Sequence, residues 1–302
     1  MSAVTRRAYG KINVFLRVVG KRRDGYHEIE SLVVPISLAD RVSARLAPAL
    51  RLNVSGNTTT GVPQGPANLA LLAALALAEA CEPSEGAEIS ITKHVPAAGG
   101  LGGGSSDAAA VLHALSELWE CELRPSALSR IGAALGSDVP AALRAAPVVM
   151  RGRGETLRPA KIGGTQWWTL VPFDFPVRSP DAYRWWDEDR ERSGPSPTAL
   201  LRAAAAGKLR RLGELLFNDL EGPVLRRHPE VAEVKERLLS AGALGAVMSG
   251  SGPTVVGLAE DRSHAQRLAR RFEGAKVVSA PPDRMTGVAL PARDNRKRSG
   301  VV

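Results

Sequence analysis

The residues that most clearly indicate a chemical function lie in a glycine-rich segment at 96–107. The segment reads Pro-Ala-Ala-Gly-Gly-Leu-Gly-Gly-Gly-Ser-Ser-Asp. Glycine adopts positive φ readily and lets a ligand approach the bare backbone, so consecutive N–H groups can turn toward one anion. Small and apolar residues then recur at helical spacing, and either Ser105 or Ser106 is expected to cap the helix that they form. Because the N-terminus of a helix attracts negative charge, the segment predicts a phosphate-binding loop.

Two common phosphate-binding motifs do not fit this segment. A P-loop requires a lysine directly after Gly104, and the dinucleotide fingerprint requires glycine or alanine three residues after Gly102, but Ser105 stands at both places. A flexible glycine linker is the structural alternative. The position of the segment, between a strand-like run at 87–93 and an amphipathic helix, argues against a linker.

Lys11 and Asn13 form a second candidate constellation. They lie two residues apart on a strand-like run, so both side chains are expected on the same face. A charged donor beside an amide suits a polyanionic ligand. The alternative is that Lys11 is one more exposed lysine on a basic protein.

Asp138 lies in the turn Gly-Ser-Asp-Val-Pro at 136–140, after an expected helix. Its carboxylate has two interpretations: it accepts a proton during catalysis, or it caps the next segment, as aspartate often does. Taken alone, the turn favours the cap.

Tyr26 and His27 follow the turn signal Asp24-Gly25 at the end of a basic hairpin. Such a pair usually marks the start of a strand, although an aromatic ring and an imidazole can also stack on a base and form hydrogen bonds to its edge.

A second glycine-serine segment, Ser-Gly-Ser-Gly-Pro-Thr at 249–254, joins two apolar runs. By itself it indicates a turn.

Alternating and β-branched runs near the N-terminus predict the strands that carry the first of these residues. The expected strands are at 11–19, 29–36, 41–46, 50–54, 87–93, 148–151, 166–172, 244–248, 254–259 and 275–279. The expected helices, the first capped by Asn68, are at 68–81, 105–119, 126–135, 197–206, 209–217, 229–241 and 263–272. This order predicts a β-rich N-terminal half and layered strands and helices in the C-terminal half.

The composition of the chain limits its class. With 302 residues, of which 44% are hydrophobic, it is long enough for one large or two modest globular domains. The formal charge of +9 suits anionic ligands, whereas the basic stretch at 293–298 lacks aromatic neighbours and predicts no nucleic-acid partner. No apolar run reaches the roughly 18 residues that span a bilayer, so no membrane association and a cytoplasmic location are expected.

Cys81 and Cys121 are the two cysteines of the chain, and neither has a second cysteine or histidine at metal-binding spacing. Cysteines remain reduced in the cytoplasm. Both are therefore expected to be reduced, buried and small apolar residues.

Several segments, in their order along the chain, resemble the motifs of the GHMP kinases, a superfamily of small-molecule kinases. The matching segments are Lys11 with Asn13, Arg-Asp-Gly-Tyr-His at 23–27, the glycine loop, the turn at 136–140 and the segment at 249–254. The resemblance extends from about Tyr9 to Ser279 and is greatest to members whose acceptor carries a cytidine diphosphate group.

The resemblance implies an α+β, two-domain GHMP kinase fold. Residues 1–160 are expected to form a β-rich N-terminal α/β domain with the glycine loop, and residues 161–283 a layered C-terminal α/β domain. Residues 284–302 are expected to form a disordered basic tail.

The resemblance also implies catalytic and acceptor-binding roles. An aspartate matching Asp138 acts as general base on the acceptor hydroxyl, and a lysine matching Lys11 holds it ionised and neutralises developing charge. The implied acceptor-binding residues, the last three of them around the cytosine, are Asn13, Tyr26, His27 and Tyr183.

ATP is the implied phosphoryl donor and Mg²⁺ the implied metal, with Ser106 as the metal-side hydroxyl. The implied nucleotide-binding residues are Asn68, Pro96, Ala97, Ala98, Gly99, Gly100, Leu101, Gly102, Gly103, Gly104, Ser105 and Ser106. The expected protein is a monomeric or weakly dimeric kinase for a small-molecule cytidine diphosphate substrate. The alternatives are a homoserine-type or mevalonate-type kinase and a catalytically silent nucleotide-binding protein.

Two stretches depart from the family pattern. Phe-Asp-Phe at 173–175 replaces the usual Pro-Gly before Tyr183. Ala-Ala-Leu-Arg-Ala-Ala-Pro at 141–147 replaces a bulky phenylalanine followed by Gly-Gly. The second departure predicts a reshaped wall next to Asp138.

Overall fold

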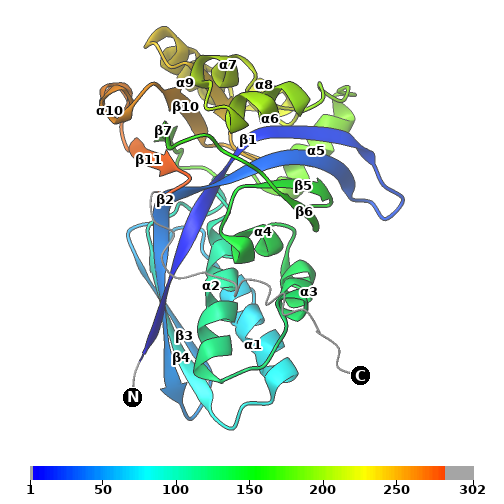
Figure 1. Ribbon diagram of the computed structural model, residues 1–302, viewed down its shortest axis with the longest axis vertical. Coiled ribbons are helices and arrows are strands. Elements are labelled where there is room, and N and C mark those ends of the chain that lie inside the picture. Colours follow the sequence, from blue (N-terminus) through cyan, green and yellow to red (C-terminus); the bar gives the residue numbers. More distant parts are fainter. Residues whose placement is uncertain (1–2, 283–302) are drawn as a thin grey trace, which may run out of the picture.

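The computed structural model of the protein describes residues 3–282, so the tail expected at 284–302 lies outside the described residues. Within 3–282 the strands form two sheets (Figure 1). The seven strands of the first are β1 (Val4–Lys21), β2 (His27–Ala47), β3 (Arg51–Gly56), β4 (Gly86–Lys93), β5 (Val148–Gly152), β6 (Thr156–Pro159) and β8 (Phe217–Asn218). The four strands of the second are β7 (Gln166–Val171), β9 (Gly245–Met248), β10 (Val255–Ala259) and β11 (Lys276–Ala280).

Helices are interspersed with these strands along the chain, singly or in runs of two or three. Those in residues 3–282 are α1 (Leu69–Cys81), α2 (Gly103–Leu118), α3 (Pro125–Leu135), α4 (Val139–Arg144), α5 (Ser179–Glu188), α6 (Thr198–Ala205), α7 (Leu209–Glu214), α8 (Glu221–Arg227), α9 (Pro229–Ser240) and α10 (Arg262–Ala269). None of them is long and apolar enough to cross a membrane.

The first sheet is built on a long hairpin of β1 and β2. The two strands pair antiparallel from Val4 opposite Ala44 to Lys21 opposite His27. The strand order is β3-β4-β2-β1-β8, with β5 and β6 attached to β2. Irregularities in the β1 register lie directly before Lys11 and directly after Asn13. Because a bulge redirects the side chains beside it, these irregularities lie where the strand delivers functional groups.

Helices α1 and α2 cover one face of the first sheet, in the lower part of Figure 1. They run in the same direction. At their N-terminal ends, a Cβ on Gly104 would lie 3.8 Å from Cδ1 of Leu69. At their C-terminal ends, Cys81, the last residue of α1, is bonded to Cys121, which follows α2. The facing side chains are small and fully buried, as in Ala73, which lets the two helices approach closely. Both helix N-termini therefore lie at the same end of the layer.

The second sheet is antiparallel, in the order β11-β7-β10-β9. Trp168 of β7 belongs to the same buried cluster as Ile12 and Phe15 of β1, so the two halves of the chain share a core. β8 adds to this connection, because Phe217 and Asn218 pair in parallel with β1. The expected α+β class and layered C-terminal half are confirmed. The domain boundary at 160/161 stays a prediction, and the second sheet begins with β7.

Most predicted elements are present, with three kinds of difference. The strands expected at 29–36 and 41–46 form one strand, β2, which continues through the buried carboxylate of Asp40. The helix expected at 209–217 ends at Glu214, because the residues that follow pair with β1 as β8. Helices α4, α5 and α8 were not predicted, since each is short and carries proline in its first turns or in its body.

The prediction that Cys81 and Cys121 are reduced is wrong for this structure, because they form a disulfide. Both residues are half-buried instead of fully buried. The bond joins the last residue of α1 to the segment after α2, where the parallel course of the two helices brings these positions together. Local sequence patterns could not predict this pairing, because the two cysteines are 40 residues apart.

Candidate active site

The glycine loop leads directly into the N-terminus of α2. Gly102, at φ 68°, is the N-cap of the helix, which begins at Gly103. The prediction that Ser105 or Ser106 caps the helix is therefore wrong: both lie in its first turns, and the Ser106 hydroxyl donates to the carbonyl of Tyr9 at 2.6 Å. The first N–H groups of a helix have no intrahelical partners. In α2 they belong to the glycines and the serine of the loop.

Two loop glycines are required by close approach as well as by positive φ. A Cβ on Gly100, at φ 75°, would lie 1.9 Å from the carbonyl oxygen of Ser249. A Cβ on Gly102 would lie 3.0 Å from Cγ and Cε of Lys11. The loop is therefore packed directly against the segment at 249–254 and against Lys11.

Lys11 connects three separate parts of the chain. Its Nζ donates to Oδ1 of Asn13 at 2.5 Å and to the carbonyl of Gly100 at 3.0 Å. It also stands 3.4 Å from Oδ2 of Asp138, and only 13% of the lysine side chain is exposed. The alternative of a free surface lysine does not apply, and the prediction that Lys11 and Asn13 share a face is confirmed.

Asn13 is fixed by its own hydrogen bonds and is only 4% exposed. Its Nδ2 donates to Oγ of Ser31 at 2.8 Å, and its backbone N–H donates to Oγ of Ser249 at 3.1 Å. The Ser249 hydroxyl in turn donates to the carbonyl of Gly100 at 3.0 Å. The loop at 249–254 thus holds both the Asn13 backbone and the glycine loop.

The carboxylate of Asp138 faces Lys11 and makes no capping hydrogen bond, although the residue precedes α4 at the N-cap position. Its side chain is 35% exposed. Pro140 in the first turn has no N–H to be capped. The capping interpretation is therefore not the one that the structure adopts, and the carboxylate is available to a ligand.

The rings of His27 and Tyr183 stack on each other. Their ring centroids are 4.9 Å apart with an interplanar angle of 20°. Nε2 of His27 lies 2.9 Å from Oδ1 of Asp187, which is one turn after Tyr183 on α5. The other oxygen of Asp187 accepts a hydrogen bond from Lys21 at 2.6 Å. Two side chains of α5 thus orient the imidazole: Tyr183 stacks on its face and Asp187 lies at its Nε2.

Tyr26 stands beside this stack and is 54% exposed. The guanidinium of Arg153, from the turn between β5 and β6, lies 4.6 Å from the centroid of the Tyr26 ring. Such a cation on the ring face is attracted by the ring quadrupole. The guanidinium of Arg153 therefore covers one face of the Tyr26 ring.

Two pKa shifts describe the electrostatics of this region. Burial raises the pKa of the Tyr183 phenol well above its ordinary value, and the charge of Asp138 raises it further, so the phenol stays a neutral donor. For Asp187, burial acts to raise the pKa, but the hydrogen bonds from His27 and Lys21 outweigh it and lower the pKa below its ordinary value. An ionised Asp187 accepts a hydrogen bond from Nε2–H of His27, and in the tautomer that carries this hydrogen Nδ1 is an acceptor.

A cavity of about 830 Å³ connects the glycine loop, Lys11 with Asp138, and the His27 stack. Its volume falls within the roughly 300 to 1,000 Å³ of ordinary ligand sites. The predicted site residues that line it are Lys11, Asn13, Tyr26, His27, Ala98, Gly99, Gly100, Gly102, Gly103, Gly104, Ser105, Asp138 and Tyr183. Those outside its lining are Asn68, Pro96, Ala97, Leu101 and Ser106.

Asn68 acts as the predicted N-cap of α1. Its Oδ1 accepts from the N–H of Ala70 at 2.9 Å, and its Nδ2 donates to the carbonyl of Pro63 at 2.9 Å. This part of the prediction is confirmed. A contact between Asn68 and the nucleotide stays a prediction.

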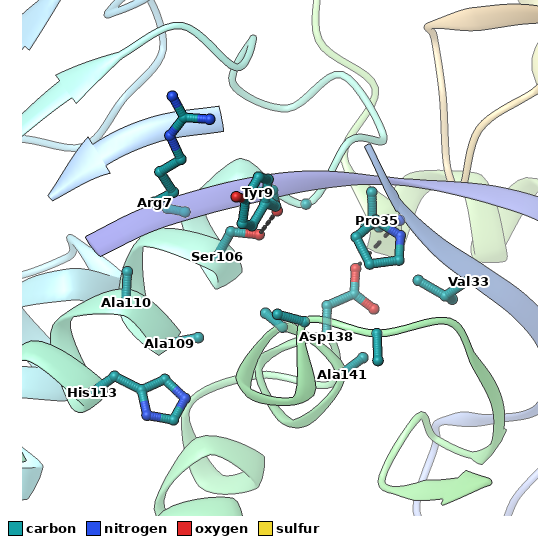
Figure 2. A pocket seen from close by; sticks show the side chains of 16 residues that line it. Arg7, Tyr9, Val33, Pro35, Ser106, Ala109, Ala110, His113, Asp138 and Ala141 are labelled. Carbon is teal, nitrogen blue, oxygen red and sulfur yellow. Dashed lines mark hydrogen bonds and ion pairs between the residues drawn. The ribbon is translucent and has the colours of Figure 1, made fainter. Parts of the chain in front are cut away.

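A second cavity, of about 30 Å³, lies next to Lys11 and Asp138 and is shown in Figure 2. Its walls come from β1, β2, α2 and α4, and His113 of α2 closes one side. The stretch at 141–147, where a reshaped wall was predicted, contributes Ala141 and three further alanines to the lining. The space that these small side chains leave is about that of one water molecule.

The oxygen atoms near the loop suit a metal ion that also binds the phosphates of the substrate. No group of three or more His, Cys, Asp or Glu side chains within 3–282 is placed to hold a metal ion. Ser105 and Asp138 supply oxygen atoms on the cavity wall, whereas Ser106, the predicted metal-side hydroxyl, is 4% exposed and bonded to Tyr9. Mg²⁺ commonly binds through one or two protein oxygens together with substrate phosphates, which these residues fit.

Three contributors to the site were not predicted. Asp187 orients His27, Arg153 supports Tyr26, and Asn218 donates to the carbonyls of Met248 and Gly250 at 2.8 and 2.7 Å. Asp187 could have been found, because it lies four residues after Tyr183 and shares its helix face. The other two depend on contacts between distant segments, for which the sequence carries no local signal.

Two family models match the chain. The one described as GHMP kinases N terminal domain matches residues 68–145, which contain the glycine loop and Asp138. The one described as GHMP kinases C terminal matches residues 200–277, which contain the loop at 249–254. A homoserine kinase from Cytophaga hutchinsonii has the same fold, with a TM-score of 0.72 at 19% identity over 93% of this chain and 95% of that one. The chain therefore belongs to the GHMP kinases.

More similar proteins lie in one branch of that family. The 4-diphosphocytidyl-2-C-methyl-D-erythritol kinase of Symbiobacterium thermophilum is 42% identical over 266 residues, which cover 87% of this chain and 93% of the relative. A crystal structure of 4-(cytidine 5'-diphospho)-2C-methyl-D-erythritol kinase matches with a TM-score of 0.77 at 36% identity, over 91% of this chain and 98% of that one. This chain groups with these kinases, as the resemblance of its motifs implied.

Proposed function

We propose that this protein transfers the γ-phosphoryl group of ATP to the 2-hydroxyl of 4-diphosphocytidyl-2-C-methyl-D-erythritol, in the non-mevalonate route to isoprenoid precursors. The products are the 2-phosphate and ADP. One observation carries the proposal: a single cavity joins the glycine loop, the Lys11–Asp138 pair and the His27–Tyr183 stack. A cytoplasmic location, the absence of a nucleic-acid partner and a monomeric or weakly dimeric state belong to the same proposal, although the Cys81–Cys121 disulfide is a feature that cytoplasmic proteins rarely have.

The nucleotide binds at the start of α2. Gly103, Gly104 and Ser105 line the cavity and are the first residues of the helix, so their N–H groups are directed toward the phosphates. The absence of acidic side chains from the first turn leaves the helix dipole unopposed there. When Mg²⁺ is bound to the nucleotide, it supplies positive charge to the phosphate oxygens.

Phosphoryl transfer depends on positioning and charge neutralisation more than on covalent help from the protein. Asp138 accepts the proton of the acceptor hydroxyl while the hydroxyl oxygen bonds to the γ-phosphorus and the bond to ADP breaks. Lys11, 3.4 Å from Asp138, stabilises the ionised carboxylate and the charge on the transferred group. Asn13 keeps Lys11 in this position through their 2.5 Å hydrogen bond.

The cytosine binds between the aromatic side chains. Tyr26 and the stacked pair of His27 and Tyr183 provide ring faces, and a base stacks on such faces. Because the carboxylate of Asp187 accepts a hydrogen bond from Nε2–H, Nδ1 of His27 accepts a hydrogen bond from a donor such as the exocyclic amine of cytosine. The site thus selects a base with an amino group.

The two rival functions leave parts of the site without a use. A homoserine or mevalonate acceptor has no base to place beside His27 and Tyr183. A silent nucleotide-binding protein does not need a cation and a carboxylate 3.4 Å apart at the open side of the loop.

The proposal is tested by incubating the purified protein with ATP, Mg²⁺ and a panel of alcohols with and without a cytidine diphosphate group. ADP release and phosphorus NMR of the product are measured. We expect turnover with 4-diphosphocytidyl-2-C-methyl-D-erythritol and a new phosphomonoester at its 2-oxygen. Equal or faster turnover of homoserine or mevalonate, or no ADP release with any alcohol, contradicts the proposal.

A further inference from the structure

A buried ion cluster lies directly behind the glycine loop, and no step of the proposed reaction uses it. It consists of Asp40 of β2, Lys93 at the end of β4 and Asp107 of α2, whose side chains are 0%, 1% and 6% exposed. The ammonium of Lys93 contacts Oδ2 of Asp40 and donates to Oδ2 of Asp107 at 2.6 Å. The other oxygen of Asp40 accepts hydrogen bonds from the backbone N–H groups of His94 and Val95.

The cluster contacts the glycine loop at the first residue of the helix. A Cβ on Gly103 would lie 3.4 Å from Nζ of Lys93 and 3.2 Å from Cγ1 of Val95, so the bare backbone of Gly103 packs on both. Asp107 lies one turn further along the same helix. Lys93 therefore joins α2 to β4 at both ends of its first turn, and Asp40 joins this assembly to β2.

We propose that the Asp40–Lys93–Asp107 cluster is a positioning device for the nucleotide. It fixes the first turn of α2 against the sheet, so that the N–H groups of residues 103–105 meet the phosphates in one geometry. The kinetic readout of this inference rests on the proposed function, but nucleotide binding is measurable without an acceptor.

Lys93 is the one cation that the two carboxylates of the cluster share. Asp40 accepts three hydrogen bonds, from Lys93 and from the N–H groups of His94 and Val95. Asp107 depends on Lys93 alone, because its Oδ1 is buried without a hydrogen-bond partner in the described part of the chain. Burial raises the pKa of Asp107 to about 7, since the attraction of Lys93 does not outweigh burial together with the repulsion of Asp40. Lys93 is therefore the residue whose removal most directly releases the first turn of α2.

The test measures ATP binding by calorimetry in Lys93→Met, with Asp219→Asn as the matched control. Asp219 is also a buried carboxylate that accepts backbone N–H groups, from Val18 and Gly194, but it makes no contact with the glycine loop. Because the loss of one hydrogen bond to a charged phosphate lowers affinity by about tenfold or more, Lys93→Met is expected to weaken ATP binding at least about tenfold and to leave the acceptor KM within about twofold. Asp219→Asn is expected to lower the melting temperature and to change neither constant.

A folded Lys93→Met variant with unchanged ATP affinity, or with an equal rise in the acceptor KM, overturns the proposal. If Lys93→Met does not fold, the uncharged triple variant Asp40→Asn/Lys93→Met/Asp107→Asn gives the same measurement. Failure of the proposed function appears separately, as a wild-type protein that binds ATP normally and does not turn over the cytidine substrate.

Discussion

Gly100→Ala is expected to impair catalysis beyond any loss of stability that alanine causes at positive φ, because Gly100 is the point where three motifs meet. Its carbonyl accepts hydrogen bonds from Lys11 and Ser249, and a Cβ on it would lie 1.9 Å from the Ser249 carbonyl oxygen. Ordinary contact begins at 3.4 Å. The loops at 96–107 and 249–254 must therefore separate by about 1.5 Å, the difference between these distances.

The magnitude follows from that separation. A displacement of about 1 Å near the reacting groups can cost roughly 10²-fold in rate, which is about 2.7 kcal/mol of transition-state stabilisation. An alanine at positive φ costs about 1 to 2 kcal/mol of folding free energy in addition. We therefore expect kcat/KM of Gly100→Ala to fall about 10²-fold or more.

Gly164→Ala is the matched control, because Gly164 has φ 74°, close to the 75° of Gly100, and a Cβ there would meet nothing within 4 Å. Urea unfolding measures the stability of both variants, and steady-state kinetics measures turnover. Both should lose the stability that alanine costs at positive φ, Gly100→Ala should lose more because it also separates two packed loops, and only Gly100→Ala should lose activity. Wild-type kcat/KM in a folded Gly100→Ala variant, or an equal loss in Gly164→Ala, refutes the assigned contact between the two loops.

Three further predictions concern other parts of the structure. His27→Ala should raise the KM for the cytidine acceptor with little change in the KM for ATP, since it removes a hydrogen bond worth about 1 kcal/mol or more; a change in the ATP constant alone is the contradictory result. Cys81→Ser should lower the free energy of unfolding by about 4 kcal/mol, because the disulfide that it removes joins residues 40 apart. A reductant should lower the melting temperature of the wild type and leave that of the variant unchanged; equal stability of the two proteins argues that the thiols are free. Asp107, whose pKa is about 7 when folded and near 3.8 when unfolded, binds more protons in the native state between these values. Its contribution to stability should therefore decline as pH rises from about 4 to about 7, and urea unfolding of Asp107→Asn should lack this slope.

The catalytic motifs were predictable because their chemistry is local. The glycine run, the spacing of Lys11 and Asn13, and the turn around Asp138 each restrict the backbone or the side-chain direction over a few residues. The start of α2 was not predictable in the same way. Ser105 and Ser106 are better caps by residue type, but the packing of Gly102 on Lys11 fixes a left-handed residue earlier in the chain.

The supporting contacts of the site were not predictable, because topology and not spacing creates them. Asp187 reaches His27 across 160 residues, and Lys93 reaches Asp40 across 53. Each partner is an ordinary charged residue in its own segment. Only the pairing of β2 with β4 and the placement of α5 beside the hairpin bring them together.

The most direct test of catalysis by Asp138 is the turnover of Asp138→Asn beside its nucleotide affinity and melting temperature. Asparagine keeps the shape and removes the proton acceptor, so we expect kcat to fall by about 10² to 10⁴ while ATP binding stays close to that of the wild type. The carboxylate makes no capping hydrogen bond, so little loss of stability is expected. Normal turnover together with a lowered melting temperature contradicts the role of Asp138 as the base and leaves Lys11 as the charged catalytic candidate.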